Sequence, residues 1–235
     1  MKLSIIICAY NERRTILEAI RQAHEVDLGD GWEKEVIVVD NFSTDGTREL
    51  LQTVEMPGVR TIFHPRNLGK SASVLTGVSE ARGDYFAIFD ADLEYDADDL
   101  RRMVSLIAPG ETVAVFGSRV LGGRKVYEYA QNYWGVRILT WMANVLFRGQ
   151  LSDIAVGTKL ARVDVVRSLN LSGYDFDLDF ELPCKLLKNG YQIEEVPIAY
   201  HPRTAAQGKG IVGSKAFSTG FRVLWIYLRT FLEKN

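Results

Sequence analysis

The sequence has few of the features that mark a secreted or membrane-spanning protein. It contains two cysteines in 235 residues, Cys8 and Cys184. So small and widely spaced a pair excludes a disulfide-rich scaffold and favours reduced thiols in a cytoplasmic protein. No apolar run reaches about 18 residues, so no transmembrane helix is predicted. The apolar stretch near the N-terminus is short and has no small-residue cleavage site, which favours a first strand over a signal peptide.

Charge and motif patterns exclude further classes of protein. Lys and Arg number 28 against 30 Asp and Glu, and this formal net charge of −2 gives no bias towards nucleic acid. The histidines His24, His64 and His201 are isolated, and none lies at zinc-ligand spacing from a cysteine. The first apolar segment is followed by Cys-Ala-Tyr-Asn-Glu rather than by Gly-x-Gly-x-x-Gly, which disfavours a dinucleotide-binding oxidoreductase.

The sequence does contain a regular alternation of apolar and amphipathic segments. Hydrophobic residues make up 47% of the chain and charged residues 25%, which supports a packed core. The length fits one α/β domain, with or without a short C-terminal elaboration. Short apolar runs typical of strands buried on both faces alternate with helical spacing, which predicts a mostly parallel, doubly wound sheet. The predicted strands are residues 3–9, 35–40, 59–64, 84–89 and 113–116, and the predicted helices are residues 12–26, 47–54, 68–81 and 98–107.

The second half of the chain is more helical and more apolar. Its predicted helices are residues 133–147, 179–188 and 217–232, with strands within residues 151–162 and over residues 191–200. We divide the chain into a domain over residues 1–216 and an apolar helix over residues 217–235. That helix is too short to span a bilayer, and it either packs on the domain, forms a dimer interface or lies on a membrane surface.

Polar clusters follow the first, second and fourth predicted strands. In such sheets, ligands bind beyond the carboxyl ends of the strands. The sharpest cluster is Asp90-Ala91-Asp92, followed by Glu94. Carboxylate oxygens are hard ligands suited to Mg²⁺ or Mn²⁺, and a nucleoside diphosphate can complete the metal shell. Asp-x-Asp also occurs by chance in acidic loops, so its place directly after a strand is what favours a metal site.

Further segments follow the order of motifs in a known enzyme family. They are residues 4–12 (SIIICAYNE), 38–47 (VVDNFSTDGT), 67–77 (NLGKSASVLTG), 81–94, 117–119 (GSR), 151–153 (LSD) and 190–203 (GYQIEEVPIAYHPR). In this order the chain resembles the inverting glycosyltransferases of family 2, and most of all their polyprenyl-phosphate sugar synthase branch. The resemblance covers nearly the whole chain and implies the GT-A fold, a Rossmann-like α/β architecture.

On the donor side, the resemblance implies that Tyr10, Glu12 and Asp40 hold the nucleoside of a UDP- or GDP-sugar. Asp90, Asp92 and Glu94 then surround a Mg²⁺ or Mn²⁺ ion, and Asp90 also contacts the donor. Lys70 begins a helix beside Gly69, where it either binds an anion of the donor or is an ordinary solvated lysine. The family often has Gln at the position of Glu94 and Asp at that of Asn41, so the charge of the site differs.

On the acceptor side, the resemblance assigns the phosphate of a polyprenyl phosphate to Arg137 and Thr140, and Arg119, which follows a strand, is expected to project into the same cleft and bind substrate. Arg137 and Thr140 lie one helical turn apart, and the planar guanidinium of Arg suits phosphate. The alternative for Arg137 is that it is a solvated residue on an otherwise apolar helix. Arg203 and Lys209 belong to a loop that in the family contacts the donor diphosphate, although this loop is longer here.

The implied reaction is an in-line displacement at the anomeric carbon, with the metal and basic groups stabilising charge on the leaving diphosphate. The predicted catalytic residues are Asp92, Arg119, Asp153 and Glu181. Asp153 and Glu181 are candidate general bases for a hydroxyl acceptor, and the alternative is that they hold a loop or orient an arginine.

Two alternatives to transfer onto a polyprenyl phosphate stay open at this point. One is a soluble family 2 enzyme that glycosylates a hydroxyl of a sugar or small molecule. Another is a catalytically inactive sugar-nucleotide-binding subunit, which the intact Asp90 and Asp92 pair disfavours. The expected location is cytoplasmic, with peripheral attachment to the cytoplasmic face of a membrane as a variant.

Overall fold

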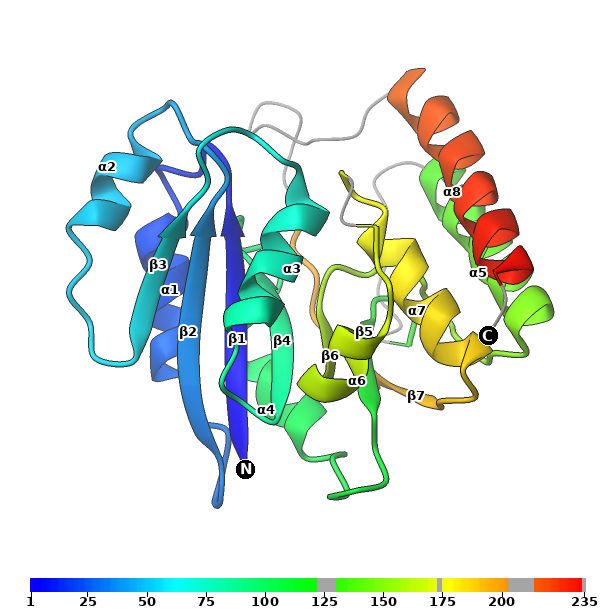
Figure 1. Cartoon of the computed structure of the whole chain (residues 1–235), viewed down its shortest axis with the longest axis horizontal. Helices are drawn as coiled ribbons and strands as arrows, with labels where there is room; N and C mark the ends of the chain where they lie inside the picture. Colours follow the sequence, from blue (N-terminus) through cyan, green and yellow to red (C-terminus); the bar gives the residue numbers. More distant parts are fainter. Residues whose placement is uncertain (122–129, 173–174, 203–213, 234–235) are drawn as a thin grey trace.

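The computed structural model describes residues 1–121, 130–172, 175–202 and 214–233, with the backbone alone for residues 130–132 and 214–219. These residues form a mixed α/β structure around a seven-stranded sheet with the strand order β3-β2-β1-β4-β6-β5-β7 (Figure 1). The strands are β1 (Lys2–Ala9), β2 (Glu33–Asp40), β3 (Val59–Phe63), β4 (Tyr85–Asp90), β5 (Ala114–Ser118), β6 (Lys159–Arg162) and β7 (Ile193–Pro197).

The sheet is mostly parallel, as predicted. Strands β3, β2, β1 and β4 run parallel, and β5 runs parallel to β7. Strand β6 is antiparallel to both β4 and β5, with Phe86 opposite Ala161 and Val115 opposite Leu160. The central strands are buried on both faces, which explains their continuous apolar runs.

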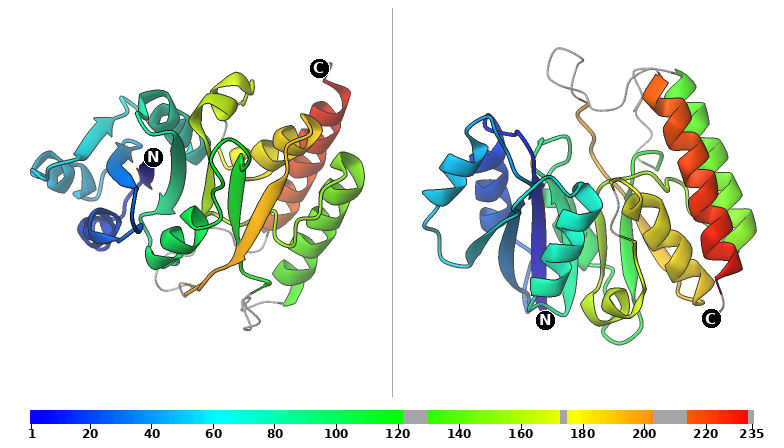
Figure 2. Two further views of the ribbon diagram at one scale, coloured as in Figure 1. Left: turned by 90° about the horizontal axis from the view of Figure 1, so that it is seen from below. Right: turned by 45° about the horizontal axis from the view of Figure 1, so that its top comes forward.

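Helices cover both faces of the sheet (Figure 2). Helices α3 and α6 lie on one face, and α1 and α4 lie on the other. The bounds are α1 (Ile16–Glu25), α2 (Thr47–Gln52), α3 (Lys70–Glu80), α4 (Asp98–Val104), α5 (Ala130–Phe147), α6 (Val163–Ser168), α7 (Leu178–Lys188) and α8 (Ser214–Leu232).

Helix α8 packs against α5 and α7 at one end of the sheet. The Tyr227 hydroxyl donates to the carbonyl of Leu139 over 3.1 Å, and the Tyr227 and Phe147 ring centroids are 6.2 Å apart. The helix begins at Ser214, three residues before the predicted start. The division of the chain at residue 217 stays a prediction.

Sequence and structure differ in a few elements. Helix α1 starts at Ile16 rather than at residue 12, because the preceding residues form a polar turn. Helix α6 was not predicted, and it is only six residues long. Gly190 has a φ of 81° directly after α7, the left-handed conformation expected of a helix-ending glycine. Both cysteines are free thiols, as expected.

Candidate functional site

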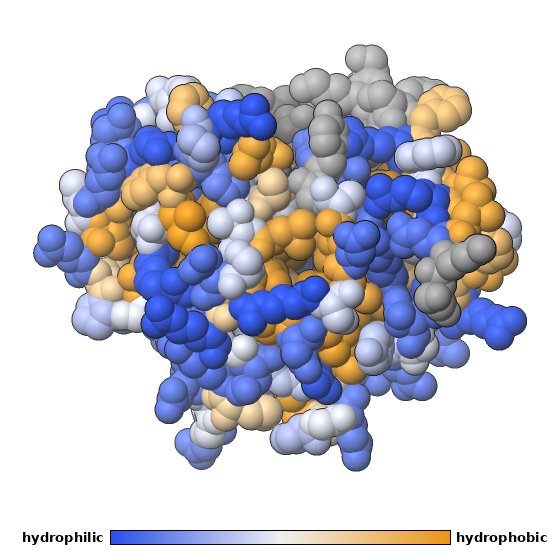
Figure 3. Space-filling view, viewed as in Figure 1, coloured by the Kyte–Doolittle hydropathy of each residue, from blue (hydrophilic) through white to orange (hydrophobic). Residues whose placement is uncertain are grey.

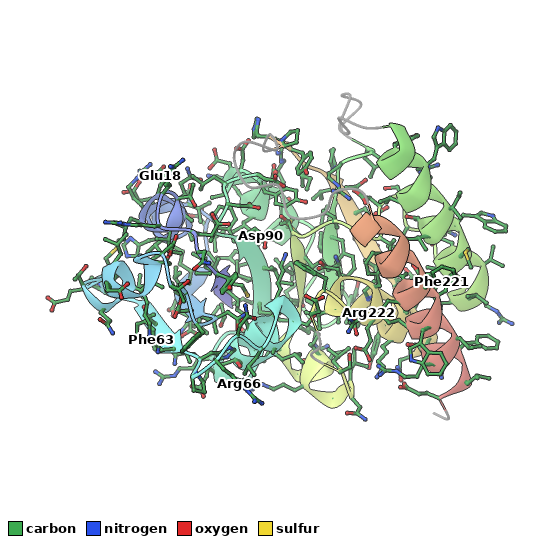
Figure 4. The ribbon with its side chains drawn as sticks, turned by 90° about the horizontal axis from the view of Figure 1, so that it is seen from above. Glu18, Phe63, Arg66, Asp90, Phe221 and Arg222 are labelled. Atoms are coloured by element: carbon green, nitrogen blue, oxygen red, sulfur yellow. The ribbon has the colours of Figure 1, made fainter. Side chains whose placement is uncertain are left out.

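The site lies at the edge where the carboxyl ends of β1, β2 and β4 meet (Figure 1). Figure 4 looks onto this edge and shows Asp90 near the middle of the view, between Phe63 on one side and Phe221 and Arg222 of α8 on the other. The turns after β1 and β2 are joined by hydrogen bonds, since Asn11 N donates to Ser43 Oγ over 3.0 Å and Thr44 N to Asn11 Oδ1 over 2.8 Å. The predicted polar clusters therefore lie together.

The predicted nucleoside residues differ in their exposure. Tyr10 is exposed and Glu12 is half-buried, with its carboxylate accepting from Thr15 Oγ1 over 3.1 Å. Asp40 is fully buried, and its two oxygens accept from Ser43 N over 3.2 Å and from Arg48 Nη1 over 3.0 Å. The carboxylate of Asp40 thus already has protein donors on both oxygens, so these contacts give no support to its predicted part in holding the nucleoside.

A second buried polar cluster lies behind this turn. The Asn41 side chain accepts from Leu68 N over 2.8 Å and donates to Asn67 Oδ1 over 2.9 Å. His64 bridges Asn41 Oδ1 and Thr76 Oγ1 at 3.1 and 3.0 Å. Burial lowers the pKa of His64, although the Asp40 carboxylate acts in the opposite direction. Asn41 therefore holds the start of the α3 segment rather than facing a ligand.

The Asp90 carboxylate pairs with Lys70, with 2.7 Å between Lys70 Nζ and Asp90 Oδ1. The Lys70 side chain is 20% exposed, so Lys70 is not the solvated surface residue of the alternative reading. Burial opposes its charge, but Asp90 and Asp179 hold the pKa of Lys70 well above its usual value. Gly157 packs against the same carboxylate, because a Cβ added at this position would clash with Asp90 Oδ2. Asp90 is therefore fixed by a cation on α3 and by a close backbone approach.

The remaining two predicted metal ligands follow β4. Asp92 Oδ1 accepts from Glu94 N over 3.1 Å, and the Glu94 side chain shares a hydrogen bond with Tyr200. Among the residues that the structure describes, no three His, Cys, Asp or Glu side chains lie close enough to hold a metal ion. The predicted three-carboxylate cluster is therefore not preformed, since Asp90 is paired with Lys70. Asp92 and Glu94 still offer hard oxygens that suit Mg²⁺ or Mn²⁺ together with diphosphate oxygens.

Arg119 and Asp153 form a buried, bidentate ion pair. Arg119 Nε lies 2.7 Å from Asp153 Oδ2 and Nη2 lies 2.8 Å from Oδ1, while Arg119 N adds a third bond of 3.2 Å. The side chains are 9% and 0% exposed, and the guanidinium lies over the Tyr200 ring at 5.3 Å. Asp153 thus orients an arginine, which is the alternative to a general base that the sequence left open.

The loop over residues 151–154 brings together the residues predicted to lie on the acceptor side. Arg137 Nη1 donates to Ser152 O over 3.3 Å, and Ile154 N donates to Thr140 Oγ1 over 3.3 Å. Arg119, Arg137 and Thr140 therefore all contact this one loop, which contains Asp153, although they come from separate parts of the sequence.

Glu195 of β7 holds the same loop in place. It accepts from Ser152 N over 2.8 Å and from Asp153 N over 3.2 Å. Burial raises the pKa of Glu195, against the effect of these two hydrogen bonds.

Glu181, the second candidate base, is fully buried in the packing of α7 against α8. Its carboxylate accepts from Ser172 N and Oγ over 2.8 and 2.7 Å and lies 3.2 Å from Lys185 Nζ, and it also pairs with Arg229 of α8. These contacts favour the structural alternative. A catalytic role for Glu181 stays a prediction without support from them.

Three residues near the site were not predicted from the sequence, and two predicted ones lie outside the described residues. Glu195 and Tyr200 belong to residues 190–203, whose resemblance was recognised although their roles were not. Lys159 is fully buried, and its Nζ lies 3.6 Å from Asp179 Oδ1. In the sequence it is a lone basic residue with no pattern that indicates a role. Arg203 and Lys209 fall outside the described residues.

Helices α5 and α8 share a large exposed apolar surface. The exposed side chains recur at helical spacing and comprise Trp134, Ile138, Trp141 and Val145 on α5 and Phe221, Leu224, Trp225, Leu228, Phe231 and Leu232 on α8. They contribute to the orange right-hand edge of Figure 3. No helix within the described ranges is long and apolar enough to cross a membrane. We call these ten residues the apolar face.

Comparison with known proteins places this architecture in a family. The model of the glycosyl transferase family 2 matches residues 4–169. A dolichol-phosphate mannosyltransferase of Pyrococcus furiosus is 29% identical over 214 residues, which cover 89% of this chain and 59% of that protein. A low-salt glycan biosynthesis hexosyltransferase of Haloferax volcanii is 26% identical over 226 residues, which cover 94% of this chain and 51% of that protein. The chain thus spans little more than half the length of these two relatives.

A solved structure confirms the fold. Glucosyl-3-phosphoglycerate synthase of Mycobacterium tuberculosis, in complex with Mn²⁺, UDP and phosphoglyceric acid, superposes with a TM-score of 0.72 at 17% identity. The match covers 100% of this chain and 80% of that one, so the GT-A architecture predicted from the sequence is confirmed. With the family model matching well over half of its residues, the chain belongs to the glycosyl transferase family 2.

Proposed function

We propose that this chain transfers a sugar, with inversion, from a nucleoside diphosphate donor to a polyprenyl phosphate. The observation that carries the proposal is the convergence of Arg119, Arg137 and Thr140 on the loop over residues 151–154, on the acceptor side. Arg137 is exposed and suits a phosphate directly, while Arg119, held by Asp153, and the buried Thr140 fix the loop beside it. A phosphate is already anionic and needs no general base. The named activity of the Pyrococcus relative, on dolichol phosphate, agrees with this acceptor class.

Asp92 and Glu94 would hold a divalent metal together with the donor diphosphate. Such a metal, when bound, stabilises charge on the leaving diphosphate. The chemistry of two hard carboxylates beside the strand end fits Mg²⁺ or Mn²⁺, and the Mycobacterium neighbour was crystallised with Mn²⁺ and UDP. Lys70 holds the Asp90 carboxylate in place by an ion pair.

The donor site is tested by thermal unfolding with UDP, GDP, CDP and dTDP, each with and without Mn²⁺. A ligand that binds only the folded protein raises its stability by RT ln(1 + [L]/Kd). We expect one nucleotide to give a metal-dependent increase that Asp92→Asn abolishes. The matched control Asp164→Asn replaces an exposed aspartate on α6 and should keep the increase. If no nucleotide changes the unfolding temperature, the proposed donor site is wrong.

The acceptor is tested by supplying the matching nucleotide-sugar with either a polyprenyl phosphate or a water-soluble sugar. Transfer to the lipid phosphate supports the proposal. Transfer to the soluble hydroxyl alone would instead support the alternative enzyme class.

We further propose that the apolar face attaches the protein to the cytoplasmic surface of a membrane, where a polyprenyl phosphate resides. Transfer of its ten side chains from water to the membrane surface is favourable, and its tryptophans, Trp134 and Trp141 on α5 and Trp225 on α8, suit the interface. Replacing Trp141 and Trp225, which are 65% and 63% exposed, with lysine should abolish co-sedimentation with vesicles and leave thermal stability unchanged. The control Leu17→Lys changes an exposed residue of α1 and should bind vesicles normally.

A further inference from the structure

Phe42, in the turn after β2, combines a strained backbone with an exposed aromatic ring. Its φ is 67°, in the left-handed region that disfavours residues with a Cβ atom. The side chain is 43% exposed, so folding gains only part of the benefit of burying a phenyl ring. Strained residues kept by a rigid environment are concentrated at ligand sites.

The turn that carries Phe42 is held rigidly. Ser43 bonds to Asp40 through its N–H and to Asn11 N through its hydroxyl. Thr44 N bonds back to the Asn11 side chain over 2.8 Å, and Asn11 itself has a φ of 59°. The two turns therefore fix each other, and the backbone of Phe42 cannot relax without breaking these bonds.

Arg48 lies over the Phe42 ring, with its guanidinium carbon 5.8 Å from the ring centroid. The same guanidinium lies 4.9 Å from the Phe63 ring centroid and donates to Asp40 and to His64 O, each over 3.0 Å. This arrangement orders the ring of Phe42 while leaving much of it open to solvent.

We propose that Phe42 is the stacking platform for the nucleobase of the donor. The inference rests on the proposed function, because it assumes a nucleotide at the carboxyl edge of β1, β2 and β4. Asp40 is buried and already bonded there, whereas the aromatic rings of Phe42 and Tyr10 on these turns are exposed and can contact a base. Every nucleobase has a π-face that stacks on an aromatic ring.

The alternative is that Phe42 only shields the Arg48–Asp40 pair, and the variant Phe42→Gly separates the two roles. Glycine relieves the strain at φ 67°, so a stacking platform predicts an unfolding temperature equal to or above that of the wild type. It also predicts UDP or GDP binding about 10-fold weaker in the presence of Mn²⁺, as expected for the loss of one stacking contact. Binding of Mn²⁺-pyrophosphate, which has no base, should stay unchanged.

The controls are Phe42→Leu and Phe231→Leu. The first keeps the strain and the apolar bulk without the aromatic ring, so nucleotide binding should weaken while stability changes little. The second changes an exposed aromatic residue of α8 and should leave nucleotide binding unchanged. Calorimetric titration and thermal unfolding supply both readouts.

If Phe42→Gly bound UDP and GDP with wild-type affinity, this inference would be overturned and the proposed function would stand. The same holds if the variant lost affinity equally for the nucleotide and for pyrophosphate. A wild-type protein that binds no nucleoside diphosphate would overturn both this inference and the proposed function.

Discussion

Replacing Asp153 with alanine tests whether its pair with Arg119 is part of the folded core. The variant removes the acceptor of three hydrogen bonds and leaves the Arg119 guanidinium charged in a site where its side chain is 9% exposed. Removing one partner of a buried pair costs about 3–5 kcal/mol, because the other charge is left without compensation. Against a typical stability of about 5–15 kcal/mol, this is a large loss.

For a chain of this length, each kcal/mol lowers the unfolding midpoint by about 2–4 °C, so we expect a decrease of roughly 6–20 °C. Urea unfolding followed by far-UV circular dichroism measures the change in free energy directly, with the slope checked for two-state behaviour. The double variant Asp153→Ala/Arg119→Met should recover part of the loss, since it removes the isolated charge as well.

The matched control is Asp27→Ala, because Asp27 also pairs with an arginine, Arg101, but on the surface. Their side chains are 72% and 57% exposed, and such pairs contribute little. If Asp153→Ala destabilises the protein no more than Asp27→Ala does, the buried pair is not a structural element and the reasoning is refuted.

Three further predictions concern single contacts. Burial lowers the pKa of His64, so the imidazole binds a proton more weakly in the folded protein than in the unfolded chain. The stability that His64 contributes is therefore fully present above its unfolded pKa and is lost as the pH falls through its folded pKa. Unfolding free energy should therefore fall from pH 7 towards pH 5, and His64→Asn should flatten this dependence, whereas an unchanged slope would contradict it. Lys70→Met removes the cation beside Asp90 and should strengthen Mn²⁺ binding without nucleotide, measured by thermal shift; weaker binding would show that Lys70 does not compete with the metal. Glu195→Ala leaves two backbone N–H groups without acceptors and should cost about 1–3 kcal/mol each, while Glu195→Gln keeps an acceptor and should retain much of the stability; equal losses in urea unfolding would count against the anchoring role.

Local patterns in the sequence were sufficient for most of the architecture. Strands β1, β2 and β4 follow from apolar runs, and their polar ends predicted where a site would lie, because parallel strands end at one edge. The order of the motifs was sufficient to recognise the family. Helix α6 escaped prediction because it is six residues long and begins directly after β6, so no turn residues mark its start, whereas the equally short α2 follows Asp45 and Gly46.

The roles of individual charged residues could not be read from spacing. Asp153 and Glu181 were both candidate bases in the sequence. In the structure, Asp153 forms an ion pair with Arg119, and Glu181 forms ion pairs with Lys185 and Arg229. Whether a carboxylate is a base, a metal ligand or a structural partner depends on which side chains come near it and on how much water they exclude.

The sequence by itself determined the fold class, the family and the edge of the sheet that carries the polar residues, since periodicity and motif order are local properties of the chain. Only the tertiary structure decided the pairings: Lys70 with Asp90, Arg48 with Asp40, and the apolar stripes of α5 and α8 joined into one face. Pairings of this kind join residues far apart in the sequence, and their electrostatic and hydrophobic energies depend on distances and burial that exist only after the chain has folded.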